Sequence, residues 1–250
     1  MDESAVPNLA FEGVSKAFGT TTVLQDVTVA FKSGRVTAIV GASGCGKSTL
    51  LRIGNGLLRA DRGTVRVLGE PLADTMPRSV RKRVGYAVQG TGLFPHLTAR
   101  QNMVLAAELN GWDRARIEER VDQLLSLMQL APELLLRHPH QLSGGQQQRV
   151  GLCRAMMMHP ELLFLDEPFA AIDAITRIEI HEELLELLHA EPATVVLVTH
   201  DMREAFTLAD DILLLAEGRI LRHQSVTALR DEFPGAEPES LLRELVGSGS

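Results

Sequence analysis

Residues 41–48 read Gly41-Ala42-Ser43-Gly44-Cys45-Gly46-Lys47-Ser48, and they decide the fold. They match G-x-x-x-x-G-K-[ST], the pattern of phosphate-binding loops. Residues 35–40 before them predict a buried strand, and residues 48–58 after them predict a helix. The alternative is a chance match in a glycine-rich turn, and this strand and helix argue against it. The stretch therefore predicts an α/β domain whose chain wraps around phosphate groups.

In such a loop, glycines let the backbone approach phosphates closely, and the following helix adds its positive N-terminal end. Lys47 is expected to contact the β- and γ-phosphates, and Ser48 to ligate magnesium. The residues expected to bind the nucleotide through the loop are Gly41, Ser43, Gly44, Cys45, Gly46, Lys47, Ser48 and Thr49. The loop alone does not distinguish an ATPase from a GTPase or a kinase.

A second polar pair follows a short apolar strand. Residues 162–165 read Leu-Leu-Phe-Leu and are followed by Asp166 and Glu167. Ligands of open α/β sheets gather at the carboxyl edge of the strands, so we expect both acids near the loop. The alternative is two solvated charges at a strand end, and the presence of the loop makes it the weaker interpretation.

The composition suits one large domain, because the chain has 250 residues and 45% of them are hydrophobic. The net charge of -7 and the lack of a Lys/Arg block make the chain a poor candidate for nucleic-acid binding. Cys45 and Cys153 are interpreted as reduced thiols. No apolar run reaches the length of a membrane span, so a membrane role is expected to require a partner.

Strand and helix patterns alternate along the chain, which indicates a mostly parallel sheet. Two N-terminal strands are expected at residues 9–14 and 23–31, and a helical insert at about 92–158. Further strands are expected at 63–69, 84–88, 162–165, 195–198 and 212–215, and helices at 174–189 and 202–209. The domain is expected to span residues 1–230, with 231–250 a short segment ending in a flexible tail at 247–250.

Between the loop and the acidic strand lies Leu142-Ser143-Gly144-Gly145-Gln146. It resembles the signature motif of the ATP-binding cassette (ABC) ATPases, and the resemblance extends over about residues 9–226 with the motifs in the family's order. It implies a RecA-like P-loop NTPase core with antiparallel N-terminal strands. It also implies ATP and Mg²⁺ as ligands. In the family, two subunits pair head to tail, and Ser143, Gly144 and Gly145 would bind the ATP held by the other subunit.

The resemblance implies further roles residue by residue. Phe18 would stack on adenine, Gln89 would reach magnesium and the lytic water, and Asp166 would order the magnesium shell. Glu167 would act as the general base, Asp173 would couple the two sites, and His200 would contact the γ-phosphate. Each has a bland alternative: Phe18 as turn packing, Gln89 as a surface amide, His200 as a strand-end imidazole. The departures are Phe18 in place of the more common Tyr, and Ala170 and Ile172 in place of the usual Ser and Leu.

Transport is suggested by residues 92–98, Gly-Leu-Phe-Pro-His-Leu-Thr. In bacterial importers the corresponding surface receives an integral membrane permease, so Phe94 and Leu97 are expected to form a docking groove; packing within the insert is the alternative. Residues 84–89 with 92–96 look most like ATPases of osmoprotectant uptake (glycine betaine, choline and related quaternary amines). Such a system implies a solute-binding protein outside the cytoplasm and an ATPase on the cytoplasmic face of the inner membrane. The alternatives are a soluble ABC ATPase acting on DNA or ribosomes, and an exporter of lipids or drugs.

Other features are interpreted as structural. The run Met156-Met157-Met158 predicts packing at a helix end rather than a ligand site. Cys45 is expected to be a small residue that fits the loop rather than a reactive thiol. The acidic residues Glu182, Glu183 and Glu186 predict an exposed helix face.

Overall fold

A six-stranded sheet forms the centre of the computed structural model, which describes residues 7–73, 75–170, 172–238, 240 and 241. Its strand order is β10-β9-β3-β8-β7-β6, and every neighbouring pair is parallel except β10 with β9. The strands are β3 (Val36–Val40), β6 (Val84–Ala87), β7 (Leu162–Asp166), β8 (Thr194–Val198), β9 (Asp211–Ala216) and β10 (Arg219–Ser225). The expected tail 247–250 lies outside the described residues.

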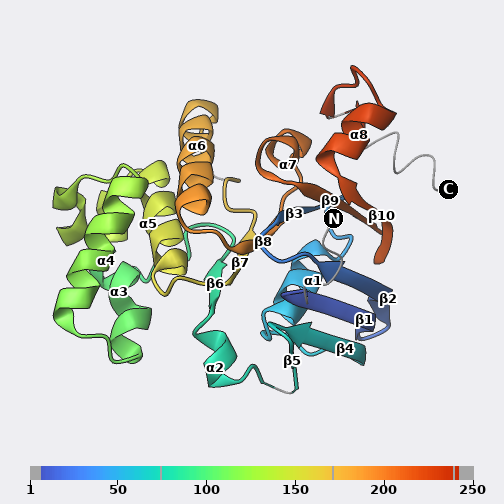
Figure 1. The fold of residues 1–250 in the computed structure, drawn as a ribbon, viewed down its shortest axis with the longest axis horizontal. Coiled ribbons are helices and arrows are strands. Elements are labelled where there is room, and N and C mark those ends of the chain that lie inside the picture. Colours follow the sequence, from blue (N-terminus) through green and yellow to red (C-terminus); the bar gives the residue numbers. More distant parts are fainter. Residues whose placement is uncertain (1–6, 74, 171, 239, 242–250) are drawn as a thin grey trace.

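A second, antiparallel sheet packs beside the first one (Figure 1). Its order is β2-β1-β4-β5, with β1 (Leu9–Phe18), β2 (Thr21–Phe31), β4 (Arg62–Val67) and β5 (Glu70–Pro71). The parallel sheet with antiparallel N-terminal strands confirms the predicted fold class. The strands β1 and β2 begin or end further out than expected, because register shifts after Phe11 and Val14 interrupt the alternation on which the prediction relied.

Helices cover the central sheet, and a group of them stands apart from the N-terminal sheet (Figure 1). The helices are α1 (Lys47–Gly54), α2 (Arg78–Arg81), α3 (Ala99–Leu109), α4 (Arg114–Leu127), α5 (Gly144–Met156), α6 (Ala174–Ala190), α7 (Met202–Leu208) and α8 (Val226–Glu232). Two 3₁₀ turns, Pro132–Leu136 and Pro139–Gln141, precede α5. Within the described residues, no helix combines the length and apolarity that crossing a bilayer requires. The domain limits 1–230 and 92–158 stay predictions.

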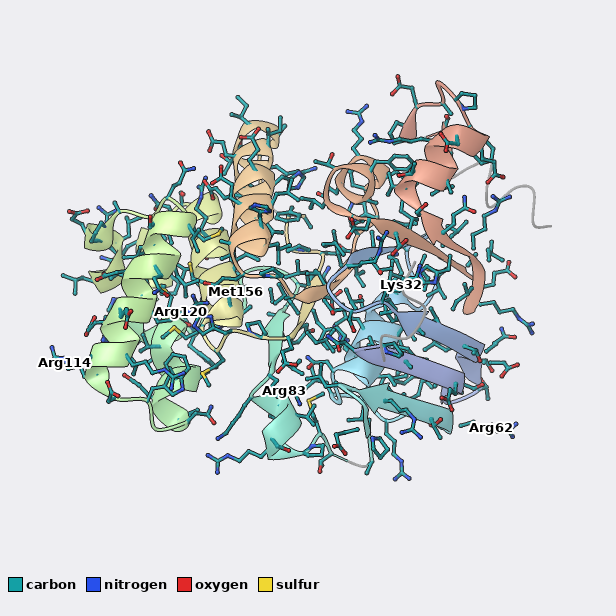
Figure 2. All side chains as sticks on the ribbon, in the orientation of Figure 1. Lys32, Arg62, Arg83, Arg114, Arg120 and Met156 are labelled. Carbon is teal, nitrogen blue, oxygen red and sulfur yellow. The ribbon has the colours of Figure 1, made fainter. Side chains whose placement is uncertain are left out.

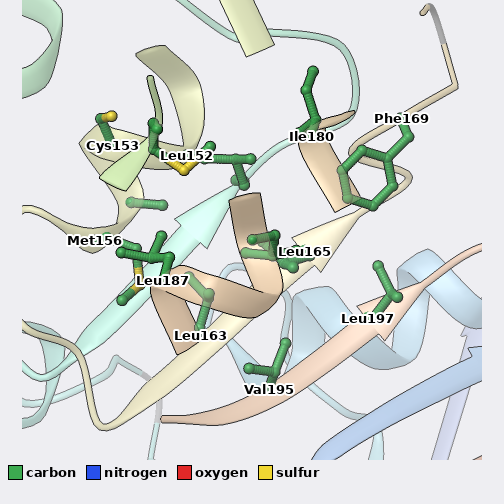
Figure 3. Packing of buried hydrophobic residues seen from close by; sticks show 14 of the residues in the cluster. Leu152, Cys153, Met156, Leu163, Leu165, Phe169, Ile180, Leu187, Val195 and Leu197 are labelled. Atoms are coloured by element: carbon green, nitrogen blue, oxygen red, sulfur yellow. The ribbon is translucent and has the colours of Figure 1, made fainter. Parts of the chain in front are cut away.

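Alternating side chains of the central strands supply two separate cores. Ile39, Phe164 and Val198 face α1 and the antiparallel sheet. Their neighbours face α5 and α6, and Figure 3 shows Leu163, Leu165, Val195 and Leu197 among side chains of those helices. Both faces of a parallel sheet are buried in this way, which explains why the strands read as continuous apolar runs. The expected packing role of the methionines is confirmed, since Met156 and Met157 are at most 1% exposed.

Edge strand β10 was not predicted from the sequence. Its residues alternate between exposed and half-buried, and polar side chains such as Arg222 and Gln224 interrupt any apolar pattern. The strand exists because it pairs with the buried strand β9. Local pattern did not reveal it because its partner, rather than its own composition, stabilises it.

The interpretation of Glu183 as part of an exposed face was wrong. Glu182 and Glu186 are exposed, but Glu183 is only 2% exposed. Its carboxylate accepts hydrogen bonds from Nε and Nη2 of Arg149 on α5, at 2.6 and 2.7 Å. A buried carboxylate needs such a partner, and Arg149 supplies it where α6 packs on α5.

A buried arginine fastens the helical region to the core. Figure 2 shows Arg120 close to Met156, and its Nη2 donates to the Met156 carbonyl at 2.6 Å. The same guanidinium pairs with Glu191, which follows α6. Burial alone would raise the pKa of Glu191, but the hydrogen bond from Arg120 lowers it overall. The positive group thus satisfies carbonyls at the C-terminal end of α5 while tying α4 to the end of α6.

His181 makes stability depend on pH. The imidazole is 7% exposed, packs edge-on against Phe169 with ring centroids 4.5 Å apart, and its Nε2 has no partner. Burial lowers the pKa of His181 to about 4. The unfolded chain therefore binds a proton at higher pH than the folded chain, so stability falls as pH drops from about 6.5 toward about 4.

We expect wild-type protein to lose as much as about 2 kcal/mol of stability through this group between pH 7.5 and pH 5. Urea unfolding at both pH values measures the loss, and His181→Met should remove most of it. The control is His189→Met, an exposed histidine on the same helix, which should leave the pH dependence unchanged. An equal pH dependence in His181→Met and wild type would contradict the assignment.

Candidate functional site

The phosphate-loop residues form a tight turn between β3 and α1. Gly46 precedes the helix without a side-chain cap, so the first N–H groups of α1 are open to a ligand. The Lys47 side chain is buried, and its ammonium donates to the carbonyls of Gly41 and Ala42, both at 2.9 Å. Ser43 and Gly44 are exposed, and Thr49 is half-buried on the first turn of α1. The expected loop is therefore a single cradle with one buried positive charge.

Two glycines of the loop are required by close contacts. A Cβ at Gly41 would lie 2.1 Å from the Leu215 carbonyl oxygen, and one at Gly46 would lie 2.9 Å from the Val23 carbonyl oxygen. Gly46 also has φ 110°, a conformation that L side chains rarely adopt. At these two glycines the loop backbone packs directly on β2 and β9. The opposite side of the loop is left for a ligand.

Cys45 belongs to the structure of this cradle. Its thiol is 9% exposed, and burial raises its pKa even though the nearby Lys47 charge opposes the shift. A raised pKa reduces the thiolate fraction, which is the reactive form. The interpretation of Cys45 as a small residue that fits the loop is therefore supported.

The loop and the acidic strand end meet through one hydrogen bond. The Ser48 hydroxyl donates to Oδ1 of Asp166 at 2.9 Å. Asp166 is fully buried, and its Oδ2 has no hydrogen-bond partner; the Arg52 guanidinium lies 3.9 Å from that oxygen. Burial raises the pKa of Asp166, and the Ser48 hydrogen bond acts in the opposite direction. A buried carboxylate oxygen without a partner is a place where a cation is favoured.

The Ser48 hydroxyl and the Asp166 carboxylate fit magnesium. Mg²⁺ in nucleotide sites is held by one or two protein oxygens together with phosphates, rather than by a cage of protein ligands. Across the part of the chain that the structure describes, no three His, Cys, Asp or Glu side chains come together as a metal cluster. Ser48 with Asp166 is the arrangement that a phosphate-bound cation needs.

Glu167 turns out of the strand toward two other candidate residues. Its φ of 46° is unusual for a non-glycine residue, and its N–H still bonds to the Val198 carbonyl at 2.9 Å. Its Oε2 accepts from Gln89 Nε2 at 3.4 Å and lies 3.6 Å from His200 Nδ1. The backbone turn therefore brings Gln89, Glu167 and His200 together.

Phe18 lies at the edge of this site. It is 51% exposed at the end of β1, and the Lys16 ammonium lies 5.4 Å from the centre of its ring. It pairs with Thr21 of β2, and β2 reaches Gly46 through Val23 and Leu24. An exposed ring on a hairpin that touches the phosphate loop can stack on a planar base.

The signature residues Ser143, Gly144 and Gly145 lie in a different part of the fold from the phosphate loop. Ser143 is the N-cap of α5, where its hydroxyl accepts from the Gln146 N–H at 3.2 Å. Ser143 and Gly144 are exposed, whereas Gly145 is buried against Thr176. Helix α5 packs on α3, β6 and α6, while α1 packs on strands of both sheets (Figure 1). One chain therefore does not bring the signature residues onto its own phosphate loop.

Asp173 caps the next helix. Its carboxylate is exposed and accepts from the N–H groups of Ile175 and Thr176 at 3.2 and 3.0 Å. These bonds, first that of Thr176, lower the pKa of Asp173. The residue thus fixes the start of α6 at the surface, where a second subunit could meet it.

Two residues near the site were missed from the sequence. Asn102 is fully buried, donates to the carbonyls of Phe94, Leu97 and Thr98, and accepts from the Phe94 N–H. Arg177 contacts both the segment before α6 and the segment after β8. The only sequence signal for Asn102 and Arg177 was a polar residue within a helical pattern. That signal does not identify the residues that each of them contacts.

Comparisons with known proteins agree with this geometry. The family model described as ABC transporter matches residues 24–170. The chain is 42% identical to the glycine betaine uptake system ATP-binding protein YehX of Escherichia coli, over 86% of this chain and 70% of that protein. It is 41% identical to the choline transport ATP-binding protein OpuBA of Bacillus subtilis, over 86% of this chain and only 56% of that protein.

Among solved structures, the chain resembles the dimeric post-hydrolysis state of the ATP-binding cassette MJ0796 bound to ADP and Pi. The TM-score is 0.78 at 29% identity, and the match covers 87% of this chain and 98% of that one. On this evidence the chain belongs to the ABC transporter family, as an ATP-binding subunit with ATPase activity whose ligands are ATP and Mg²⁺.

Proposed function

We propose that the chain powers the import of a quaternary amine, such as glycine betaine or choline, as the ATPase subunit of a membrane importer. The ATPase part of the proposal rests on the Ser48–Asp166 hydrogen bond, which joins the phosphate loop to the acidic strand end beside Glu167. The names of the two relatives described above support the solute class. The importer would include a permease and an external solute-binding protein, with the ATPase on the cytoplasmic face of the inner membrane.

In this proposal the residues share the work of hydrolysis. Lys47 and the loop N–H groups bind the phosphates, and Phe18 stacks on the base. Glu167 accepts a proton from the attacking water, while Gln89 and His200 hold that water and the γ-phosphate in place. Ser48, Asp166 and Gln89 would hold Mg²⁺, which when bound offsets phosphate charge.

We propose that the second half of each site comes from another copy of the chain or a paired ATPase subunit. Ser143, Gly144 and Gly145 would contact the γ-phosphate held by the opposite loop, and Asp173 would connect the two sites. The exposed N-terminus of α5 supports this. Ser143 caps the Gln146 N–H, but the first turn carries no acidic side chain, so the positive end of the helix favours an anion. ATP would then hold the two subunits closed, and hydrolysis would release them.

The exposed Phe94 and a basic groove that shares Arg154 with it support docking of the permease. Phe94 is 43% exposed, and the Arg154 guanidinium lies 6.0 Å from the centre of its ring. Arg154 also lines a cavity of about 390 Å³ between β6, α3 and α5. The charged residues lining that cavity are all basic: Arg78, Arg81, Lys82 and Arg154. The groove therefore suits a segment that carries acidic side chains. Leu97 is half-buried, so it supports the loop more than it offers contact area.

Reversing two of these charges should release the chain from membranes. Because a surface ion pair contributes up to about 1 kcal/mol, Arg78→Glu with Arg81→Glu should lower membrane-bound protein about tenfold or more at low salt. Sedimentation of washed native membranes measures the bound fraction. The control pair is Arg62→Glu with Arg114→Glu, two exposed arginines outside the groove. Equal binding of both double variants would show that the groove is not the docking surface.

The transport proposal is tested in cells that lack the gene. Uptake of radiolabelled glycine betaine and choline should be lost, and should return with the wild-type chain but not with Lys47→Ala. Sulfate serves as the control solute, and its uptake should not change when the gene is lost. Unchanged amine uptake together with increased sensitivity to exported drugs would instead favour an exporter.

A further inference from the structure

Arg177 connects two segments that carry candidate site residues. It lies on the first turns of α6, just after the Asp173 loop, and its Nη2 donates to the Ile172 carbonyl at 3.1 Å. Its Nη1 donates to Oδ2 of Asp201 at 3.3 Å, directly after His200. One guanidinium therefore bridges the segment before Asp173 and the segment that carries His200.

The far side of this bridge is itself rigid. Asp201 is the N-cap of α7 and accepts from the Arg203 N–H at 2.8 Å. The Thr199 hydroxyl donates to Oε2 of Glu204 at 2.6 Å, and the other oxygen of Glu204 lies 3.7 Å from Arg177. Glu204 is 5% exposed, and burial raises its pKa. A buried acid beside a shared cation fixes the backbone on both sides of His200.

These groups enclose one small space with the proposed base. A cavity of about 30 Å³ is lined by Glu167, Ala170, Arg177, Thr199, His200, Asp201 and Glu204. The Arg177 Nε is buried and has no hydrogen-bond partner. Glu167, His200 and Arg177 therefore line the same cavity. A shift of the Arg177 side chain would change the surface against which Glu167 and His200 lie.

We propose that Arg177 is a positioning residue for hydrolysis, which holds the Asp173 segment and the His200 segment in fixed register behind Glu167. This inference rests on the proposed roles of Glu167 and His200. The planar fork of arginine can bond the Ile172 carbonyl and Asp201 together, whereas a lysine ammonium at this distance is a single point charge. Arg177 touches none of the loop residues that bind phosphate, so its effect should fall on turnover rather than on ATP binding.

The test compares Arg177→Gln, Arg177→Lys and Asp201→Asn in purified full-length chain. Because a misplacement of about 1 Å can cost about 100-fold in rate, we expect Arg177→Gln to lower kcat by about 10- to 100-fold. Affinity for a fluorescent ATP analogue should stay within about twofold, since Lys47 and the loop are intact. The kcat of Arg177→Lys should lie between that of Arg177→Gln and that of the wild type. The matched control is Arg114→Gln, an exposed arginine on α4, which should keep wild-type kcat.

The double variant Arg177→Gln with Asp201→Asn separates positioning from general loss of structure. If the two residues act through one bridge, the double variant should lose no more kcat than the worse single variant. Parallel loss of ATP affinity and melting temperature, or additive loss of kcat, would overturn the proposal. If Arg177→Gln does not fold, Asp201→Asn and Arg177→Lys still measure the same bridge.

Glu167→Gln separates a failure of the Arg177 proposal from a failure of the proposed hydrolytic site. If Glu167→Gln abolishes hydrolysis and Arg177→Gln leaves kcat within about twofold of wild type, the positioning role alone is wrong. If Glu167→Gln hydrolyses ATP normally, the proposed site assignment itself fails.

Discussion

Glu167→Gln is expected to lower ATP turnover by at least about 100-fold while ATP binding remains within a fewfold of wild type, since general bases contribute about 10²- to 10⁴-fold. Gln cannot accept the proton of the attacking water, but it is nearly the same shape as Glu. The left-handed backbone at φ 46° is therefore retained, and so is the reach toward Gln89 and His200.

The same change should reveal the dimer. If ATP joins two subunits and hydrolysis separates them, Glu167→Gln should stay paired in Mg²⁺-ATP. Size-exclusion chromatography with multi-angle light scattering, with and without Mg²⁺-ATP, measures the mass. Steady-state phosphate release measures turnover in parallel. The control is Glu186→Gln, an exposed acid on α6 that should behave like wild type in both measurements.

Either measurement can contradict the assignment. Phosphate release at a rate near wild type would remove Glu167 from its role as base. A Glu167→Gln chain that is inactive yet monomeric in Mg²⁺-ATP would keep that role but count against closure by the isolated subunit.

The sequence was sufficient for the loop, the acidic strand end and the positions of the parallel strands along the chain. Each of these is marked by a local residue pattern and by the elements on either side of it. The β3–loop–α1 unit, for example, needs only an apolar strand and glycines at 41, 44 and 46, all of which have positive φ. The two N-terminal strands were predicted from local pattern, although bulges lengthen them beyond the regular alternation. Their antiparallel arrangement was implied by the resemblance to the ABC family.

Residues whose roles depend on distant partners could not be predicted. Glu183 has the composition of a surface helix, and only Arg149, 34 residues earlier, makes its burial possible. Arg120 likewise lies in a charged stretch but bonds to Glu191, 71 residues away. Tertiary packing decides such positions, because a buried charge is tolerated only where the fold brings its partner.

Ser143→Arg is expected to abolish ATP hydrolysis while ATP binding by the monomer stays within a fewfold of wild type. Ser143 is exposed at the start of α5, away from the phosphate loop of its own chain. A long cationic side chain there would occupy the space in which the opposite subunit presents its γ-phosphate. Loss of the N-cap itself should cost only about 1 kcal/mol of stability.

A second N-cap provides the control for that structural cost. Ser225 caps α8 through the Ala228 N–H at 3.1 Å, far from the proposed site in the sequence. Ser225→Arg should lower the melting temperature by a similar amount and keep ATPase activity. If both variants lost activity alike, capping rather than a shared site would explain the effect.

Mixing two inactive chains tests the shared site directly. Ser143→Arg keeps an intact loop and Lys47→Ala an intact signature, so a mixed head-to-tail dimer contains one intact site and one doubly damaged site. With random pairing, half the dimers are mixed and half their sites are intact, which gives about a quarter of wild-type turnover. Each variant alone should stay inactive. If the mixture shows no recovery, the two halves of the site do not come from different chains in the way that the exposed α5 N-terminus indicates.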